Sequence, residues 1–523
     1  MSTSRERTVS LWMDTKVAPH AKPLRANENA DAVVIGSGIA GLSTAYELAA
    51  KGYDVVVLDR GPIGQGMTAR TTAHLASDSD DSFARMIKAR GLEAARLFHQ
   101  SHAAAIDRIE TIQGLESIAC DFRRMNGCLF PALENDPSEL DAELDAARQI
   151  GMPVSDLRGL PFEGRSELRY LCYSDQAAFH PAKYLRGLAG VIERGGGRLY
   201  CDTAAMRVEE KSGGVVVRTG NGSTVRARFA VVATNSPINV LVAVHSKQGP
   251  YRTYAMAFAV PRGAVPDALY WDTHDPYHYV RLSPGPGEED HLIVGGEDHK
   301  SGEADDAEVR FGALESWSRS LLPALGRETH RWSGQVLEPV DHTAFIGRSP
   351  ESENIYVVTG DSGQGLTHGV VASLLISRMI ADGSSPWTGL YDPARKTEST
   401  LHRFIDENLT AVKNFAEYLS PGELSSLDAL KPGCGAIVRQ RLQKIAAYRD
   451  EQGVLHLHSA KCTHLGCLVH WNSLEHCWDC PCHGSHFAAD GSVLNAPAIS
   501  PLAPIDAASI AGYSERPAGK VKA

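Results

Sequence analysis

Apolar and polar positions alternate along the chain in patterns that predict an ordered series of helices and strands. Residues 31–59 contain an apolar run, a glycine-rich turn, apolar residues at helical spacing and a second apolar run that ends in Asp59. This order predicts a strand, a helix and a second strand parallel to the first. Helical spacing also covers residues 82–116 and 138–150, and an amphipathic stretch within residues 175–200 stops at three glycines, which mark a helix end.

The middle of the chain is dominated by strand-like runs. Residues 215–219 and 225–234 flank Asn221 and Gly222, a dipeptide that favours a two-residue hairpin turn. Three further β-like segments, rich in aromatic residues, lie between residues 251 and 331. This pattern predicts an α/β domain that carries a mainly antiparallel substrate domain.

The turn after the first predicted strand has the spacing of a dinucleotide-binding site. Gly36, Gly38 and Gly41 fit the pattern G-x-G-x-x-G. In this pattern the glycines allow a tight turn, a close approach of the backbone to a pyrophosphate, and close packing of the helix on the strand. Asp59 follows Gly36 by 23 residues, where a carboxylate accepts hydrogen bonds from a ribose hydroxyl. The N-terminus of the predicted helix then faces the phosphates.

A second strand, glycine-rich turn and helix are predicted for residues 354–380, where Gly360, Gly363, Gly365 and Gly369 cluster. A simple closing strand and helix would explain the apolar residues but not this group of glycines. Two such turns, far apart in the sequence, are what a long cofactor such as FAD requires, whereas NAD binding needs only the first. The sequence therefore predicts an FAD site built from two parts.

Composition and charge narrow the class of protein. The chain of 523 residues has 43% hydrophobic and 22% charged residues and a formal net charge of −11, which disfavours nucleic acid or an anionic membrane as a general partner. The first thirty residues contain no apolar segment of signal-peptide length, and no apolar run approaches a membrane span. We expect a cytoplasmic, multidomain enzyme. Six of the ten cysteines lie between Cys434 and Cys482, a clustering that favours a metal site over a disulfide scaffold.

The C-terminal region contains the most specific motif of the chain. Cys462 and His464 are followed, after fifteen intervening residues, by Cys480 and His483. Two cysteines can hold one iron of a [2Fe-2S] cluster while two histidines hold the other, which raises the reduction potential to roughly −150 to +300 mV. A tetrahedral zinc site uses the same ligand types and is the alternative. The motif therefore predicts a metal centre, with a Rieske cluster favoured over zinc.

The sequences CTHLGC and CPCHGS around these ligands resemble the respiratory-type Rieske domain. The resemblance implies that Cys467 and Cys482 join the two ligand loops and that Ser485 hydrogen-bonds a bridging sulfide. The tyrosine often found two residues later is Phe487 here, a departure that argues against a very high reduction potential. A disulfide bond is unusual in a cytoplasmic protein, but this one would close short loops that shield a cluster.

Motifs in the rest of the chain resemble the D-amino-acid-oxidase-like FAD-dependent oxidoreductases, the group of glycine oxidase and gamma-glutamylputrescine oxidase, in the subgroup with a fused Rieske domain. The motifs are GSGIAGLSTAYELA, GMTARTTAHL, DQAAFHPAKYL, GGEDHKSG, RWSGQVLEPVDHTAFIG and GDSGQGLTHG, and the resemblance extends from Leu11 to about Leu502. The ribose-binding acid is Asp59 where the wider family usually has Glu, which shortens its reach but keeps the carboxylate. The resemblance implies that FAD is bound by Gly36, Ser37, Gly38, Ile39, Ala40, Gly41, Asp59, Arg60, Thr68, Arg70, Thr71, Thr72, Ala205, Ala233, Gly360, Asp361, Gly363, Gln364, Gly365, Leu366 and Thr367.

These patterns divide the chain into four predicted parts. They are an N-terminal arm (residues 1–28), an FAD-dependent oxidoreductase domain (29–400), a helical linker (401–430) and an all-β Rieske 2Fe-2S domain (431–523). Within the oxidoreductase domain, the FAD-binding parts are expected at about 29–80, 175–245 and 335–385, and the substrate-domain parts at about 81–174 and 246–334.

The resemblance implies oxidation of a C–N bond in an amine or amino acid by hydride transfer to flavin. Electrons would then pass singly to the Rieske cluster and on to a redox partner protein or a small electron carrier. The candidates for substrate contact are polar residues on alternating strand positions and one histidine of the second glycine-rich segment: Arg252, Tyr254, His278, Arg281 and His368. Two alternatives stay open. Electrons could flow from the cluster to a flavin that activates oxygen, or the chain could be a non-catalytic redox relay or sensor.

Overall fold

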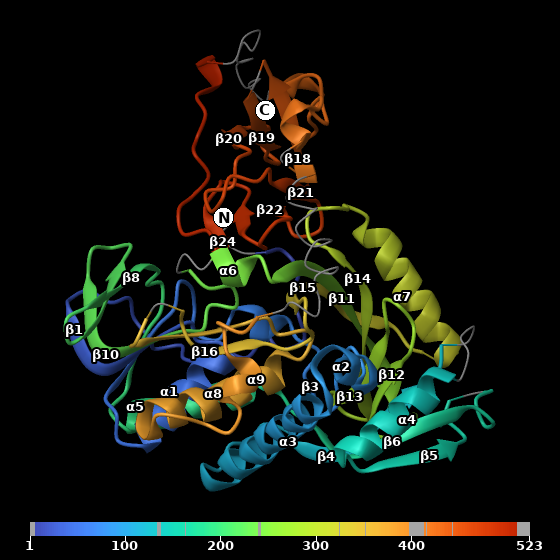
Figure 1. Ribbon diagram of the computed structural model, residues 1–523. Coiled ribbons are helices and arrows are strands. Elements are labelled where there is room, and N and C mark those ends of the chain that lie inside the picture. Colours follow the sequence, from blue (N-terminus) through green and yellow to red (C-terminus); the bar gives the residue numbers. More distant parts are fainter. Residues whose placement is uncertain are drawn as a thin grey trace. The chain divides into compact units, whose positions relative to one another are not determined.

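The chain folds into two compact units, each described by itself below (Figure 1). The larger unit lies within residues 8–299 and 306–405, and the smaller unit lies within residues 1–7, 300–305 and 406–523. The computed structural model describes residues 6–132, 138–162, 164–238, 242–323, 325–350, 352–396, 413–414, 416–441 and 443–509. Among these residues, no helix is long and apolar enough to cross a membrane.

The centre of the larger unit is a largely parallel sheet. Its strand order is β16-β17-β10-β1-β2-β7. The strands are β1 (Glu28–Ile35), β2 (Val55–Leu58), β7 (Arg198–Tyr200), β10 (Thr224–Val232), β16 (Phe345–Arg348) and β17 (Ile355–Thr359). Strand β1 pairs in parallel with β2 on one side and with β10 on the other. Its central position makes its carboxyl end, beside that of β10, the place where a ligand binds in an open α/β sheet.

Helices cover this sheet because their apolar faces pack on strands that are buried on both sides. Figure 1 shows α1 (Ile39–Ala50), α5 (Pro181–Arg194) and α8 (Gly365–Asp382) side by side, and α1 contacts both of the others. The predicted strand, helix and strand of residues 31–59 are confirmed. The hairpin is also confirmed, because β9 (Gly214–Thr219) pairs antiparallel with β10 across Asn221 and Gly222. A further strand, β8 (Ala205–Lys211), extends this ribbon.

A second, mostly antiparallel sheet forms the predicted substrate domain. Its order is β15-β11-β14-β13-β12-β4-β6-β3, and β5 pairs with β6. The strands are β3 (His74–Leu75), β4 (Arg123–Phe130), β5 (Val154–Arg158), β6 (Arg169–Ala178), β11 (Gln248–Pro261), β12 (Leu269–Asp272), β13 (Tyr279–Pro284), β14 (Glu289–Lys300) and β15 (Glu328–Pro339). Helix α7 (Ala307–Leu321) packs on β11, as Figure 1 shows, and so covers one face of this sheet.

The helical stretch predicted for residues 82–116 is two helices instead of one. They are α2 (Phe83–Arg90) and α3 (Leu92–Leu115), which meet at Gly91 with φ +88°. A backbone in this region favours glycine and ends a right-handed helix. Helix α4 (Ser138–Ile150) forms as predicted, and two short helices, α6 (Val242–His245) and α9 (Thr388–Tyr391), complete the unit. The arm before β1 packs through Trp12, which is fully buried and donates its indole N–H to the Thr71 carbonyl at 2.6 Å.

The smaller unit consists of two small antiparallel sheets. One contains β18 (Cys434–Gln440), β19 (Gln443–Arg449) and β20 (Leu455–Ser459). The other contains β21 (His470–Asn472), β22 (Cys477–Asp479), β23 (His486–Ala488) and β24 (Val493–Asn495). Residues 400–412 and 415, most of the helical stretch predicted before this unit, lie outside the described residues.

Candidate functional site

The first glycine-rich turn leaves no space for side chains. Gly36 has φ +101°, and a Cβ atom there would lie 2.2 Å from the Ala233 carbonyl oxygen. A Cβ atom on Gly41 would lie 1.9 Å from the Gly36 carbonyl oxygen. The turn therefore brings the start of α1 against the ends of β1 and β10. This is the close approach of backbone that a pyrophosphate site needs.

Asp59, at the end of β2, is buried beside this turn. Its carboxylate accepts hydrogen bonds from the Ser37 N–H at 2.8 Å, from the Ser37 hydroxyl, and from the Gly61 N–H at 2.9 Å. Burial raises the pKa of this carboxyl, although those hydrogen bonds act in the opposite direction. Next to it, a buried Nη1 atom of Arg60 has no hydrogen-bond partner among the described residues. A carboxylate and an unsatisfied guanidinium at this strand end fit the ribose and phosphate groups of FAD.

The segment after β2 (residues 61–75), which we call the cofactor loop, is tied to the turn and to the second sheet. The Thr68 hydroxyl accepts a hydrogen bond from the Ile39 N–H at 3.0 Å, which fixes the loop against the first turn of α1. The Arg70 guanidinium donates to the Ser333 carbonyl on β15 at 2.8 Å. Thr71 accepts from the Ala73 N–H at 3.0 Å. Most of these predicted contact residues thus position the loop, and Arg70 joins it to the substrate-domain sheet.

The second glycine-rich turn joins β17 to α8, and the two helix N-termini lie close together. A Cβ atom on Gly369 would lie 2.7 Å from Ile39 Cγ2 and 3.0 Å from the Ala40 nitrogen. Asp361 accepts a hydrogen bond from the Leu337 N–H at 2.8 Å, and burial raises the pKa of its carboxyl to about 6. Two helix N-termini at one place present backbone N–H groups to an anionic or electron-rich ligand. The remaining predicted contacts are also buried: Ala205 is the first residue of β8, and Ala233 directly follows β10.

The structure does not bring the five predicted substrate residues together. Tyr254 hydrogen-bonds His299 at 3.0 Å, and its ring packs edge-on against Phe311 of α7 at 5.2 Å. His278 stacks on Trp317 of α7 at 4.4 Å. Both side chains therefore lie on the face of the sheet that α7 covers. Their assignment to substrate contact stays a prediction.

The other three predicted substrate residues are buried at separate positions: Arg252, Arg281 and His368. Arg252 donates to the Ser333 hydroxyl at 3.2 Å. Arg281 donates to the Ala73 and Phe179 carbonyls, and burial lowers its pKa to about 9. His368 lies on α8 and donates its Nδ1–H to the Asp361 carbonyl at 2.9 Å, with its pKa lowered to about 4 by burial. These contacts give each side chain a structural role, and their proposed roles toward substrate stay untested.

The structure places other residues beside the second glycine-rich turn. The Asp80 carboxylate lies against this turn, because a Cβ atom on Gly363 would lie 1.8 Å from its Oδ2 atom. The Tyr277 hydroxyl donates to the same oxygen at 2.6 Å. Pattern reasoning did not single out these two residues. The signal available in the sequence was the acidic run of residues 78–81, which directly follows the predicted cofactor loop.

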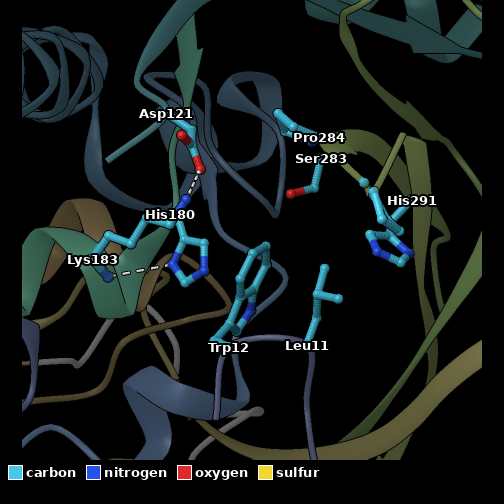
Figure 2. Close-up of a pocket in the computed structure, with 10 residues that line it drawn as sticks. Leu11, Trp12, Asp121, His180, Lys183, Ser283, Pro284 and His291 are labelled. Atoms are coloured by element: carbon cyan, nitrogen blue, oxygen red, sulfur yellow. Dashed lines mark hydrogen bonds and ion pairs between the residues drawn. The ribbon is translucent and has the colours of Figure 1, made fainter. Parts of the chain in front are cut away.

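A pocket of about 330 Å³ lies elsewhere in the larger unit, between the arm and β13. Figure 2 shows Trp12 and His180 side by side, with Lys183 to the left of His180 and Asp121 above it. The Lys183 ammonium is paired with the Asp121 carboxylate at 2.7 Å, so the charges here compensate each other. None of the lining residues is among those predicted to bind FAD or substrate. We therefore assign this pocket no chemistry.

In the smaller unit, two loops bring the four predicted metal ligands together. The Cys462 and Cys480 thiols are buried and hydrogen-bonded to each other. The His464 and His483 rings lie 4.9 Å apart at 90°, and burial lowers the pKa of each to about 4. Both imidazoles are therefore neutral at pH 7 and able to ligate a metal. Two thiols and two imidazoles fit the donor set of a Rieske cluster.

The loops that carry these ligands are held by a disulfide bond between Cys467 and Cys482. The sulfur atoms of Cys467, Cys480 and Cys482 lie within 4.8 Å of one another, but the bonded pair does not offer thiolates to a metal. The Ser485 hydroxyl contacts Cys462 and accepts a hydrogen bond from the Ala498 N–H at 3.0 Å. The Ser485 hydroxyl therefore lies beside the predicted metal ligands, as its predicted hydrogen bond to a bridging sulfide requires.

The two sites define a flavin-dependent oxidoreductase with an iron–sulfur centre. Residues 31–379 match the family described as FAD dependent oxidoreductase (DAO), and residues 424–506 match the Rieske [2Fe-2S] domain. The chain therefore belongs to the DAO family of FAD-dependent oxidoreductases and carries a C-terminal Rieske domain. The predicted fold class, FAD and the Rieske [2Fe-2S] cluster are confirmed, and the zinc alternative is set aside.

Relatives support both halves of this assignment. The protein described as "Putative Rieske 2Fe-2S iron-sulfur protein YhfW" from Bacillus subtilis (strain 168) is 32% identical over 510 residues, which are 96% of this chain and 98% of that protein. Gamma-glutamylputrescine oxidoreductase of Escherichia coli (strain K12) is 26% identical over 381 residues, 67% of this chain and 83% of that enzyme. Glycine oxidase from Geobacillus kaustophilus shares the fold, with a TM-score of 0.60 at 18% identity over 71% of this chain and 100% of that one. The protein is thus an oxidoreductase of the amino acid or amine oxidase type.

Proposed function

We propose that the protein is an amine dehydrogenase that oxidises a C–N bond and releases the electrons singly through its Rieske domain. The observation that carries this proposal is the ligand set of Cys462, His464, Cys480 and His483 in a chain of the DAO family. A two-electron flavin site does not itself need a one-electron centre. Its presence favours an external one-electron acceptor over direct reduction of oxygen.

The bound groups supply the redox chemistry: FAD accepts a hydride, and a [2Fe-2S] cluster exchanges one electron at a time. The substrate loses a hydride from the carbon beside its nitrogen and becomes an iminium ion, which water hydrolyses to a carbonyl compound and ammonium or a shorter amine. The residues of the chain have to bind the amine, remove one proton from it and shield the reacting carbon from water. Asp59, Arg60 and the two helix N-termini would hold the cofactor.

The experiment that tests this proposal is an anaerobic titration of the purified holoprotein, followed by visible spectroscopy. A panel of primary amines, secondary amines and amino acids is added in turn. Loss of the flavin absorption, followed by loss of the Rieske absorption, would support flow from amine to flavin to cluster. If every amine leaves both bands unchanged while a reduced carrier protein bleaches them, the amine dehydrogenase proposal is wrong and the reverse electron flow is favoured.

A further inference from the structure

Four carboxylates from three segments of the larger unit lie beside the second glycine-rich turn. We call them the carboxylate cluster, and its members are Asp78, Asp80, Asp298 and Glu338. Gln364, at the start of α8, donates its side-chain amide to the Asp78 carbonyl at 2.8 Å. Ser362, in the turn itself, donates its hydroxyl to Glu338 at 3.0 Å. The cluster is therefore held against the turn that is predicted to bind the flavin.

Two tyrosines line the same place: Tyr279 is the first residue of β13, and Tyr277 lies two residues before it. The Tyr277 hydroxyl donates to Asp80 at 2.6 Å, and the Tyr277 and Tyr279 rings lie 5.4 Å apart. The Tyr279 hydroxyl bonds the Thr253 hydroxyl at 3.2 Å, and its ring packs edge-on against His74 in the cofactor loop. Thr253 and Tyr279 thus mark the face of the sheet that points to the cofactor loop, opposite the face covered by α7. Carboxylates beside aromatic rings are a typical binding site for an organic cation.

The carboxylates of the cluster have no close cationic partner among the residues that the structure describes. Among the residues that the structure describes, no arginine or lysine forms an ion pair with any of the four carboxylates. Arg310, whose charge reaches Asp298, is already paired with Asp306 at 2.7 Å. His342 is likewise paired with Asp81 at 2.6 Å, next to the cluster.

Two oxygen atoms of the cluster also lack hydrogen bonds. The Oδ1 atoms of Asp78 and Asp298 are buried and accept none from any described residue. Asp78 is only 6% exposed. Buried polar atoms are nearly always paired, so an unpaired carboxylate oxygen points to a partner outside the chain.

The electrostatics of the cluster agree with this geometry. Burial, together with the charges of Asp78, Asp81 and Asp298, raises the pKa of Asp80 well above its ordinary value. Burial also raises the pKa of Asp298 to about 6. A cation bound among these groups would relieve their mutual repulsion and favour their ionised forms.

We infer that the substrate carries a second positive charge, remote from the nitrogen that is oxidised, and that Asp80 and Asp298 bind this charge. The chemical class is an α,ω-diamine or a longer polyamine. An α-amino acid would instead bring its own carboxylate toward the cluster, where like charges repel. This inference rests on the proposed amine dehydrogenase function and specifies its substrate.

The test compares a diamine with a monoamine of the same carbon chain, and with small amino acids. The rate of flavin reduction by the anaerobic holoprotein is measured in a stopped-flow instrument with butane-1,4-diamine, with butylamine, and with glycine and both isomers of alanine. We expect the diamine to exceed each of the others by at least about 30-fold in kcat/KM, the range found when one member of a buried charge pair is removed. Asp80→Asn keeps the shape and the Tyr277 hydrogen bond, and it should remove most of the preference for the diamine over butylamine.

Two further variants keep the result interpretable. Asp298→Asn should reduce the preference for the diamine in the same direction, so the test does not depend on one variant that fails to fold. Glu315→Gln, which alters a partly exposed carboxylate on α7 outside the cluster, should change nothing. If amino acids or butylamine reduce the flavin as well as the diamine does, and Asp80→Asn has no effect, the inference is wrong but the dehydrogenase function stands. If no amine of any class reduces the flavin, the proposed function fails and the inference fails with it.

Discussion

Replacing Gly41 by alanine should separate the cofactor-binding role of the first turn from general helix stability. Gly41 lies in α1, where alanine is the better helix former by about 1 kcal/mol. A Cβ atom there would nevertheless lie 1.9 Å from the Gly36 carbonyl oxygen, far inside the 3.4 Å at which ordinary contact begins. The neighbour is backbone, which is unable to rotate away, so the turn has to open.

The expected loss of FAD affinity is set by two opposing contributions: alanine favours the helix, and its Cβ atom clashes with the backbone of the turn. Overpacking of this kind typically costs about 1–3 kcal/mol, and here the opened backbone is the turn that holds the cofactor. A loss of 2 kcal/mol from the binding free energy corresponds to roughly a 30-fold weaker affinity for FAD. We therefore expect Gly41→Ala to be purified with little flavin, and to have a lower melting temperature even when FAD is added.

The matched control is Gly114→Ala in α3. Gly114 is also a helical glycine, but a Cβ atom there meets nothing within 4 Å. This variant should keep its flavin and melt at the wild-type temperature or slightly above it. The assay is the ratio of flavin to protein absorbance, followed by thermal unfolding with and without added FAD. If Gly41→Ala retains FAD as Gly114→Ala does, the turn does not act as described.

Three further predictions concern stability. Replacing Cys467 by serine removes the disulfide across a sequence separation of 15 residues, and should cost about 3 kcal/mol, visible as earlier thermal loss of the Rieske absorption. Burial lowers the pKa of His470, but Glu417 at 3.2 Å and a second glutamate outweigh burial and raise it to about 9. The stabilisation from this histidine should be full below pH about 6.5 and lost as the pH rises through about 9, and melting curves of His470→Gln should lack that loss. Asp341→Asn breaks a buried ion pair with Arg395 and should cost about 3–5 kcal/mol, measured by chemical denaturation. Glu315→Gln, which removes one partner of a partly exposed ion pair, should cost less than about 1 kcal/mol.

The parts of the structure that the sequence predicts are those set by local spacing. The turn at Gly36 to Gly41 is local, because the glycines, the helix and Asp59 all lie within one strand-helix-strand unit. The ligands of the Rieske cluster are also predictable, because each of two short motifs supplies one cysteine and one histidine. The break at Gly91 was missed because one glycine inside a helical pattern does not by itself end a helix.

The substrate side of the site depends on long-range pairing that sequence spacing does not reveal. Tyr254 and Thr253 are neighbours on β11, and only the packing of α7 decides which of them faces the cofactor loop. The alternation of apolar and polar residues predicts that the strand has two faces. It does not indicate which face packs against α7 and which faces the cofactor loop. Asp80 and Asp298 come from segments far apart in the sequence, so their meeting at one turn follows from the tertiary fold alone.

The most direct test of the account is a single-turnover experiment on the oxidised, anaerobic holoprotein. Less than one equivalent of an amine that bleaches the flavin is added, and the flavin and Rieske absorptions are followed on the millisecond to second scale. The account predicts that the cluster is reduced after the flavin, at a rate that does not change with protein concentration, and that His464→Ala shows the flavin phase alone. A cluster that stays oxidised in the wild-type protein, or a flavin that is reduced only after an external donor has reduced the cluster, would contradict it.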